Sequence, residues 1–206
     1  MKIIFATGNE GKMREVRMIM ENTGIEVISM KEAGIKTDIV EDGTTFEANA
    51  LIKARAVAKA SGLPAMADDS GLEVDAMNKE PGVYSARFLG EDTSYVIKNQ
   101  YIMDQVKDVP DEKRTCRYAC SIACVFPEGS SAVDPSEHEY TTFATLEGKV
   151  AYEAAGENGF GYDPIFFLPE YGKTDAQLPL TEKNKIGHRG KALRAMVEKL
   201  KEAGEI

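Results

Sequence analysis

Adjacent aspartates follow a short apolar run in the segment AMADDSG, residues Ala65 to Gly71. The run predicts a buried strand, and the carboxyl ends of such strands are where α/β proteins tend to bind ligands. Because neighbouring strand residues point to opposite faces of a sheet, we expect only one of Asp68 and Asp69 to face a cleft directly. With Glu41 and Glu47 nearby, these acids would form a site for a hard cation such as Mg²⁺, which prefers carboxylate oxygens. The alternative is an acidic turn in an acidic protein.

A second segment, TGNEGKMRE from Thr7 to Glu15, joins an apolar strand to an amphipathic helix. Such a loop offers backbone N–H groups and the positive end of the helix dipole to an anion. The segment is not a P-loop, because Ala6 stands where the Walker pattern needs glycine and Met13 where it needs serine or threonine. The segment indicates either a phosphate site of another kind or an ordinary polar turn.

A third segment, NGFGYDPIFF from Asn158 to Phe167, alternates glycines with the aromatic residues Phe160 and Tyr162. Aromatic faces exposed by flanking glycines can stack on a nucleobase. The carboxylate that follows them, Asp163, can bond a base edge or a ribose. A glycine-bulged strand with aromatic residues in the core explains the pattern equally well.

Lysines and arginines gather with His188 in a fourth segment, EKNKIGHRGKALR from Glu182 to Arg194, at the start of an amphipathic helix. A charge run of this kind is usually a solvated face. The whole chain, however, carries 25 Lys and Arg against 34 Asp and Glu, a formal charge of -9. This balance argues against nonspecific binding of DNA or RNA, and it means that a phosphate ligand needs a local basic cluster or a metal.

The hydrophobic pattern places each segment beside a regular element. Apolar runs predict strands at Lys2 to Ala6, Ile25 to Ile28, Ala65 to Ala67, Arg114 to Phe126, Tyr140 to Glu147 and Val150 to Ala154. Helical signals predict helices after the turn Thr7 to Gly11, from a capping-box sequence at Thr44 to Glu47 through about Ala60, from Thr93 to Val106, and over the last segment with Leu193, Met196, Val197 and Leu200. Because helices and strands interleave, we expect an α/β fold with a mixed, twisted sheet flanked by helices, in a single domain.

Three cysteines, Cys116, Cys120 and Cys124, are spaced so that a helix would cluster their thiols as for a metal. Their segment alternates like a strand, however, and no histidine lies nearby in the sequence. We therefore expect buried, reduced cysteines, which fit a cytoplasmic protein.

Neither a signal peptide nor a membrane span is expected. The apolar run at the N-terminus is too short for the first, and no stretch approaches the roughly 20 apolar residues of the second. The polar stretch Pro127 to Glu139, with His138 in it, is interpreted as an exposed hairpin tip.

Taken together, the four segments resemble the inosine triphosphate pyrophosphatase family, the non-standard purine nucleoside triphosphate pyrophosphatases, over Lys2 to about Leu200. The stretches ADDSGL, PGVYSARF, FGYDPIF and HRGKAL occur in family order, with one departure at Gly187, where bacterial relatives carry serine. The family patterns TGNxxKxxE and ENAxxKA are met by Thr7, Gly8, Asn9, Lys12, Glu15, Glu47, Asn49, Ala50, Lys53 and Ala54. The resemblance implies one domain over residues 1–206, two lobes around a nucleotide-binding cleft, and a homodimer.

The resemblance also implies site residues. Asp69 would act as the general base or water-orienting residue and share Mg²⁺ with Glu41, while Asp68 assists through water. Phe160 would stack on the base, and a fixed Arg189 donor would pair with the 6-oxo group of hypoxanthine but not with the amino group of adenine. Lys12, Lys53 and Lys183 would hold the phosphates. The implied substrate-binding set is Thr7, Gly8, Asn9, Glu10, Gly11, Lys12, Lys53, Ser70, Phe160, Gly161, Tyr162, Asp163, Lys183, His188 and Arg189.

The implied reaction is Mg²⁺-dependent hydrolysis of inosine, deoxyinosine and xanthosine triphosphates to the monophosphate and pyrophosphate. A metal and a fixed carboxylate meet its two needs, which are neutralising the triphosphate and holding a water in line. Three alternatives remain: a pyrophosphatase for other bases, a nucleotide-sensing module without turnover, and a phosphatase that releases orthophosphate. The intact acidic set speaks against the sensing module, since a pure binder of triphosphate gains little from a carboxylate facing the α-phosphate.

Overall fold

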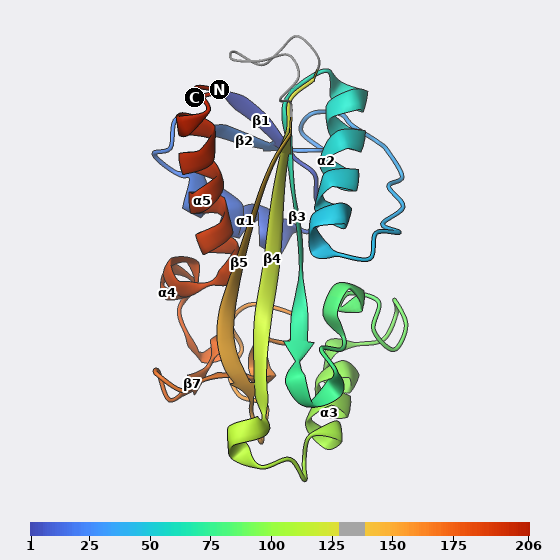
Figure 1. Ribbon diagram of the computed structural model, residues 1–206, viewed down its shortest axis with the longest axis vertical. Coiled ribbons are helices and arrows are strands. Elements are labelled where there is room, and N and C mark those ends of the chain that lie inside the picture. The colour runs from blue at the N-terminus through green and yellow to red at the C-terminus, as the bar shows by residue number, and fades with distance from the viewer. Residues whose placement is uncertain (128–138) are drawn as a thin grey trace. The chain divides into compact units, whose positions relative to one another are not determined.

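The computed structural model describes residues 1–127 and 139–206. The expected hairpin tip between Pro127 and Glu139, including His138, lies almost wholly outside these residues. The strands form one sheet in the order β2-β1-β3-β4-β5-β6-β7 (Figure 1). The chain divides into two compact units, of which the first contains Met1–Asp69, Cys120–Ala144 and Arg189–Ile206, and the second contains Ser70–Ala119 and Thr145–His188.

The first unit begins with β1 (Lys2–Phe5), α1 (Glu10–Met20), β2 (Glu26–Ser29) and α2 (Phe46–Ser61). It also holds the beginning of β3 (Ala65–Val74), the end of β4 (Thr115–Val125), the beginning of β5 (Glu139–Val150) and most of α5 (His188–Glu202). The strand β1 pairs in parallel with β2 on one side and β3 on the other. The predicted strand, loop, helix unit at the N-terminus is thereby confirmed.

Alternation along β1 explains why helices cover both faces of the sheet in this unit. Ile3 and Phe5 pack with apolar side chains of α1 and α5, whereas Ile4 packs with the alanine-rich face of α2. Successive strand residues point to opposite faces, so one strand supplies both cores. Figure 1 shows α5 (red) and α2 (cyan) on the two sides of the strands.

The second unit contains α3 (Tyr95–Gln105), β6 (Phe166–Leu168), β7 (Lys173–Thr174) and α4 (Leu180–Ile186). Short 3₁₀ helices connect these elements, among them η4 (Asp163–Ile165) and η5 (Asp175–Gln177). Its core joins Leu72 and Val74 of β3 to Ile102 of α3. The buried Arg114 donates to the carbonyl oxygens of Val106, Val150 and Ala151, which fixes the end of α3 beside the end of β5.

Three sequence-based boundaries were wrong. Asp68 and Asp69 do not leave a strand, because β3 continues through them to Val74, past the end of β1. The two strands expected between Tyr140 and Ala154 are one strand that ends at Val150. A break between the two strands was expected near Gly148. This glycine instead allows the Phe166 ring to approach the backbone of β5, because a Cβ at position 148 would lie 2.7 Å from that ring.

The third error concerns the start of α2. Thr45 is the N-cap, and its side chain accepts from the backbone N–H of Ala48, so the acidic N3 residue of a capping box is missing. The predicted stop is confirmed, since Gly62 ends this helix with a φ of 67°. The cysteines also behave as expected: all three are buried, free thiols on β4. Burial raises the pKa of Cys120 to about 12, which makes its thiol a poor nucleophile at neutral pH.

Candidate active site

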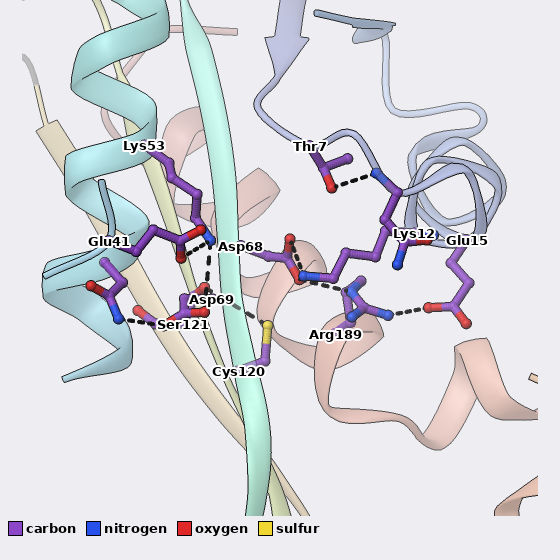
Figure 2. A network of polar contacts seen from close by, with 12 residues as sticks. Thr7, Lys12, Glu15, Glu41, Lys53, Asp68, Asp69, Cys120, Ser121 and Arg189 are labelled. Atoms are coloured by element: carbon purple, nitrogen blue, oxygen red, sulfur yellow. Dashed lines mark hydrogen bonds and ion pairs between the residues drawn. The ribbon is translucent and has the colours of Figure 1, made fainter. Parts of the chain in front are cut away.

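The strand β3 presents its two aspartates to opposite faces of the sheet, as Figure 2 shows. Asp69 points toward Lys53 and Glu41 on the α2 side, and Asp68 points toward Lys12 and Arg189 on the other side. All of these residues belong to the first unit. The expectation that these neighbouring strand residues point to opposite faces is confirmed, and which of them faces a cleft stays a prediction.

Asp69 lies in a short chain of polar contacts with the first turns of α2. Asn49 Nδ2 donates to Asp69 Oδ2 at 3.0 Å, and Lys53 Nζ lies 3.7 Å from Asp69 Oδ1. The same ammonium is 2.6 Å from Glu41 Oε2. Asn49 and Lys53 share one face of α2 because they are four residues apart. The predicted metal pair, Glu41 and Asp69, is therefore brought together around one lysine.

The electrostatics of this face suit a carboxylate that can accept a proton. Burial raises the pKa of Asp69, and Lys53 and the hydrogen bond from Asn49 oppose that effect only in part. Burial alone would lower the pKa of Lys53, but Asp68, Asp69 and Glu41 raise it, so the lysine keeps its positive charge. Asp69 is the more basic of the two aspartates.

Asp68 has the opposite character. It is fully buried, with Lys12 Nζ at 3.0 Å and Arg189 Nε at 3.2 Å from its Oδ2 atom. Burial acts to raise its pKa, but these two cations hold the pKa well below the usual value, so Asp68 stays ionised. Arg189 also donates to Glu15. Asp68 is thus an anchor for Lys12 and Arg189, and its carboxylate is a poor proton acceptor.

The loop before α1 has the geometry expected of an anion-binding turn. Asn9 is the N-cap of α1, and its side chain accepts from the backbone N–H of Lys12. Thr7 Oγ1 in turn accepts from the backbone N–H of Asn9. Gly8 and Glu10 are exposed and Gly11 is half-buried, so the loop at the positive end of the helix lies at the surface. Phosphate binding by these residues stays a prediction.

The second unit holds the glycine-rich aromatic segment. Phe160 is 38% exposed, whereas Tyr162 is buried, packs edge-on against Tyr95 and donates to the Ser85 carbonyl. The carbonyl of Gly161 accepts from Asn99 Nδ2. One aromatic ring of the segment is therefore accessible for stacking, and the other anchors the segment to α3.

The lysines predicted to hold phosphates separate into two groups. Lys12 and Lys53 belong to the first unit, whereas Lys183 belongs to the second and pairs there with Asp163 and Asp175. His188, the last residue of the second unit, stacks on Tyr118 at 4.7 Å between ring centroids, and Arg189 opens the next part of the first unit. Ser70 follows Asp69 on β3 and is half-buried.

Sequence reasoning missed the role of Asn49, although its spacing from Lys53 placed it on the same helix face. Besides its bond to Asp69, Asn49 accepts through Oδ1 from the backbone N–H of Gly43 at 2.8 Å. It therefore ties the loop that carries Glu41 to the carboxylate of Asp69. A Cβ on Gly43 would lie 2.6 Å from Asn49 Oδ1, so a side chain at position 43 must disturb the same contact.

We expect Asn49→Ala to lower turnover by about one to two decades, because a hydrogen bond to a charged group contributes roughly 1.5–3 kcal/mol. Gly43→Ala should act through the same contact, so the double variant should lose less than the two single losses combined. Steady-state kinetics would measure both effects, with thermal unfolding as the control for folding. Additive losses would show that the two residues act separately.

No group of three or more His, Cys, Asp or Glu side chains within residues 1–127 and 139–206 is arranged to hold a metal ion by itself. This finding does not conflict with Mg²⁺, which commonly uses one or two carboxylates together with substrate phosphates. Glu41 and Asp69 provide two carboxylates. The ammonium of Lys53 contacts both of them, so the two carboxylates stabilise a positive charge at this point. The donor set therefore fits a nucleotide-bound magnesium ion.

Comparison with known proteins identifies the class to which this fold and site belong. Residues 3–199 match the model of the Ham1 family, so the chain belongs to that family. The resemblance inferred from the sequence motifs is confirmed.

Individual relatives agree with the family match. The chain is 44% identical over 198 residues to a dITP/XTP pyrophosphatase of Desulforamulus reducens, covering 96% of this chain and 94% of the relative. It is 42% identical to a dITP/XTP pyrophosphatase of Shigella flexneri, covering 97% and 98%. The solved HAM1 protein of Coxiella burnetii superimposes with a TM-score of 0.86 at 38% identity, covering 98% of this chain and 100% of that chain. The Ham1 protein of Staphylococcus aureus gives 0.83 at 36% identity, covering 98% of both chains.

Proposed function

We propose that this protein hydrolyses non-standard purine nucleoside triphosphates, such as inosine, deoxyinosine and xanthosine triphosphates, to the monophosphate and pyrophosphate. The observation that carries the proposal is the pairing of Asp69 and Glu41 around Lys53, with Asn49 fixing the Asp69 carboxylate. Membership of the Ham1 family and the dITP/XTP pyrophosphatase names of its relatives support the choice of reaction and of bases.

Magnesium is proposed as the cofactor, held by Glu41 and Asp69. When bound, the ion supplies charge neutralisation on the triphosphate and polarises the phosphoryl oxygens. The protein itself would supply the positioned water. Because the pKa of Asp69 is raised, its carboxylate is suited to orient that water and accept its proton. Lys12, Lys53 and the backbone N–H groups at the start of α1 would bind the phosphates and favour pyrophosphate as the leaving group.

For the base, Phe160 is proposed to stack and Arg189 to donate to the purine 6-oxo group. Stacking alone tolerates any base, so discrimination against adenine requires the donor. Asp163, Tyr162 and His188, all of the second unit, are retained as proposed substrate-binding residues. Rejection of guanine, which shares the 6-oxo group, must come from its 2-amino side.

The products of inosine triphosphate provide the decisive test. We expect inosine monophosphate and pyrophosphate in equal amounts, with no inosine diphosphate at any time, because attack at the α-phosphorus releases pyrophosphate in one step. Chromatography of the nucleotides with separate assays for pyrophosphate and orthophosphate would establish this. Accumulation of inosine diphosphate with orthophosphate would indicate the phosphatase.

A substrate panel tests the choice of base. We expect deoxyinosine and xanthosine triphosphates to be hydrolysed efficiently and ATP and GTP poorly. Equal kcat/KM values on all five nucleotides would favour a pyrophosphatase of a different specificity. Binding without any product would favour the nucleotide-sensing module.

A homodimer is proposed as well. Val96 and Ile97 of α3 are 80% and 58% exposed, so apolar surface is available for a second copy. In the part of the chain that the structure describes, no helix is long and apolar enough to cross a bilayer.

A cytoplasmic location is proposed from the three free cysteines, since thiols stay reduced in that compartment.

A further inference from the structure

The carboxylate of Asp163 is occupied by contacts within the second unit. Its Oδ1 atom accepts from the Tyr118 hydroxyl at 2.8 Å. Its Oδ2 atom accepts from the backbone N–H of Phe160 at 2.9 Å and from Lys183 Nζ at 2.6 Å. The bond to Phe160 spans three residues, so this carboxylate shapes the turn that carries the aromatic ring.

Lys183 is held against that turn by a second acid. Its ammonium lies 3.1 Å from Asp175 Oδ2, and Asp163, Asp175 and Lys183 are all buried. The two carboxylates of Asp163 and Asp175 therefore share one ammonium group. Burial and the neighbouring Asp163 raise the pKa of Asp175 to about 7, while Lys183 opposes that rise.

The backbone of the turn passes close to the side chains of Asp163 and Lys183. A Cβ on Gly159 would lie 2.1 Å from Asp163 Oδ2 and 2.3 Å from Lys183 Nζ. The turn is also tied to η5, in which Asp175 lies, because the carbonyl of Ala176 accepts from the backbone N–H of Asn158 at 3.0 Å. Asp175 is therefore connected to the turn in two ways. One is the hydrogen bond between η5 and Asn158, and the other is the ammonium of Lys183, which contacts Asp163 as well.

We propose that Asp175 is a positioning residue for base recognition, which keeps Lys183 on Asp163 and thereby fixes the turn that presents Phe160. This inference rests on the proposed function, in which Phe160 stacks on the purine. This inference changes the role expected of Lys183 from phosphate binding to base recognition, because two carboxylates hold its ammonium in the same unit as Phe160. Lys12 and Lys53 remain the lysines proposed to bind the phosphates.

The experiment compares two product inhibitors, because inosine monophosphate carries the base and pyrophosphate does not. We expect Asp175→Ala to raise the inhibition constant of inosine monophosphate about tenfold, as for the loss of one strong contact, and to leave that of pyrophosphate unchanged. Asp175→Asn should restore wild-type inhibition, because its side-chain carbonyl oxygen can still accept from Lys183. Glu170→Ala, an exposed acid of the same unit, is the matched control and should change neither constant.

The comparison also separates this inference from the proposed function. Wild-type enzyme that releases no pyrophosphate from inosine triphosphate would overturn the proposed function. With pyrophosphate release established, equal rises in both inhibition constants for Asp175→Ala would overturn the positioning role, as would no rise in either. Failure of Asp175→Asn to restore inosine monophosphate inhibition would overturn it too.

Discussion

We expect replacement of Asp69 with asparagine to lower the turnover number for inosine triphosphate by orders of magnitude, while the nucleotide still binds. The substitution keeps the size of the side chain but removes the charge that would share the metal and the basicity that would accept a proton from water. Losses of roughly 10²–10⁴-fold are typical when a general base is removed. The measurement is kcat at saturating nucleotide and Mg²⁺, with binding followed by calorimetry.

Asp42→Asn is the matched control for this experiment. Asp42 is exposed on the loop that carries Glu41, so its loss changes the charge of the region without touching Asp69. We expect near-native turnover from this variant. If Asp69→Asn itself keeps near-native turnover, Asp69 has a structural role and Asp68 becomes the candidate base, despite the two cations that hold its pKa low.

Arg189→Ala should destabilise the folded protein strongly. The side chain is 5% exposed and contacts both Asp68 and Glu15, which would remain buried without their shared cation. Removing one partner of a buried ion pair typically costs about 3–5 kcal/mol. For a chain of this length, that corresponds to a fall in Tm of roughly 6–20 °C. Thermal and urea unfolding at neutral pH would measure the loss.

Arg194→Ala, an exposed arginine on the same helix, is the control and should leave Tm nearly unchanged. An equally small effect of Arg189→Ala would show that the ion-pair network contributes little to stability. The predicted contact with the purine 6-oxo group needs a gentler substitution, because unfolding would obscure selectivity. Arg189→Lys keeps the charge beside Asp68 and Glu15 but loses the forked donors, so it should narrow the kcat/KM ratio between inosine triphosphate and ATP.

The sequence predicted the elements best where local chemistry decides them. The helix beginning near Glu10 and the stop at Gly62 follow from N-cap and left-handed glycine preferences, which act over a few residues. The strand β3 was cut short in the prediction because adjacent aspartates are unfavourable in a buried strand. Lys12, Arg189, Lys53 and Asn49, which stabilise those aspartates, come from distant parts of the sequence.

The site was predictable to a similar extent. The family resemblance implied roles for Asp69, Glu41 and Lys53, and the structure brings these three residues together. The contacts of Asp175 could not be predicted, because nothing in the local sequence of η5 indicates that a lysine eight residues later turns back to it. Pairings of this kind depend on how α4 packs, which no short pattern encodes.

Asp68 and Asp69 point to opposite faces of β3, so the register of this strand determines which aspartate is the more basic. The two side chains are identical, and their different proton affinities arise only from which face of the sheet each one occupies. A slip of one residue would reverse the direction of every side chain in the strand. A one-residue insertion between Ala65 and Asp68 would therefore place Asp68 at the base position and Ala67 at the anchor position, whereas a one-residue deletion would place Ser70 at the base position. Both aspartates would still be present, so amino-acid composition would not reveal the loss.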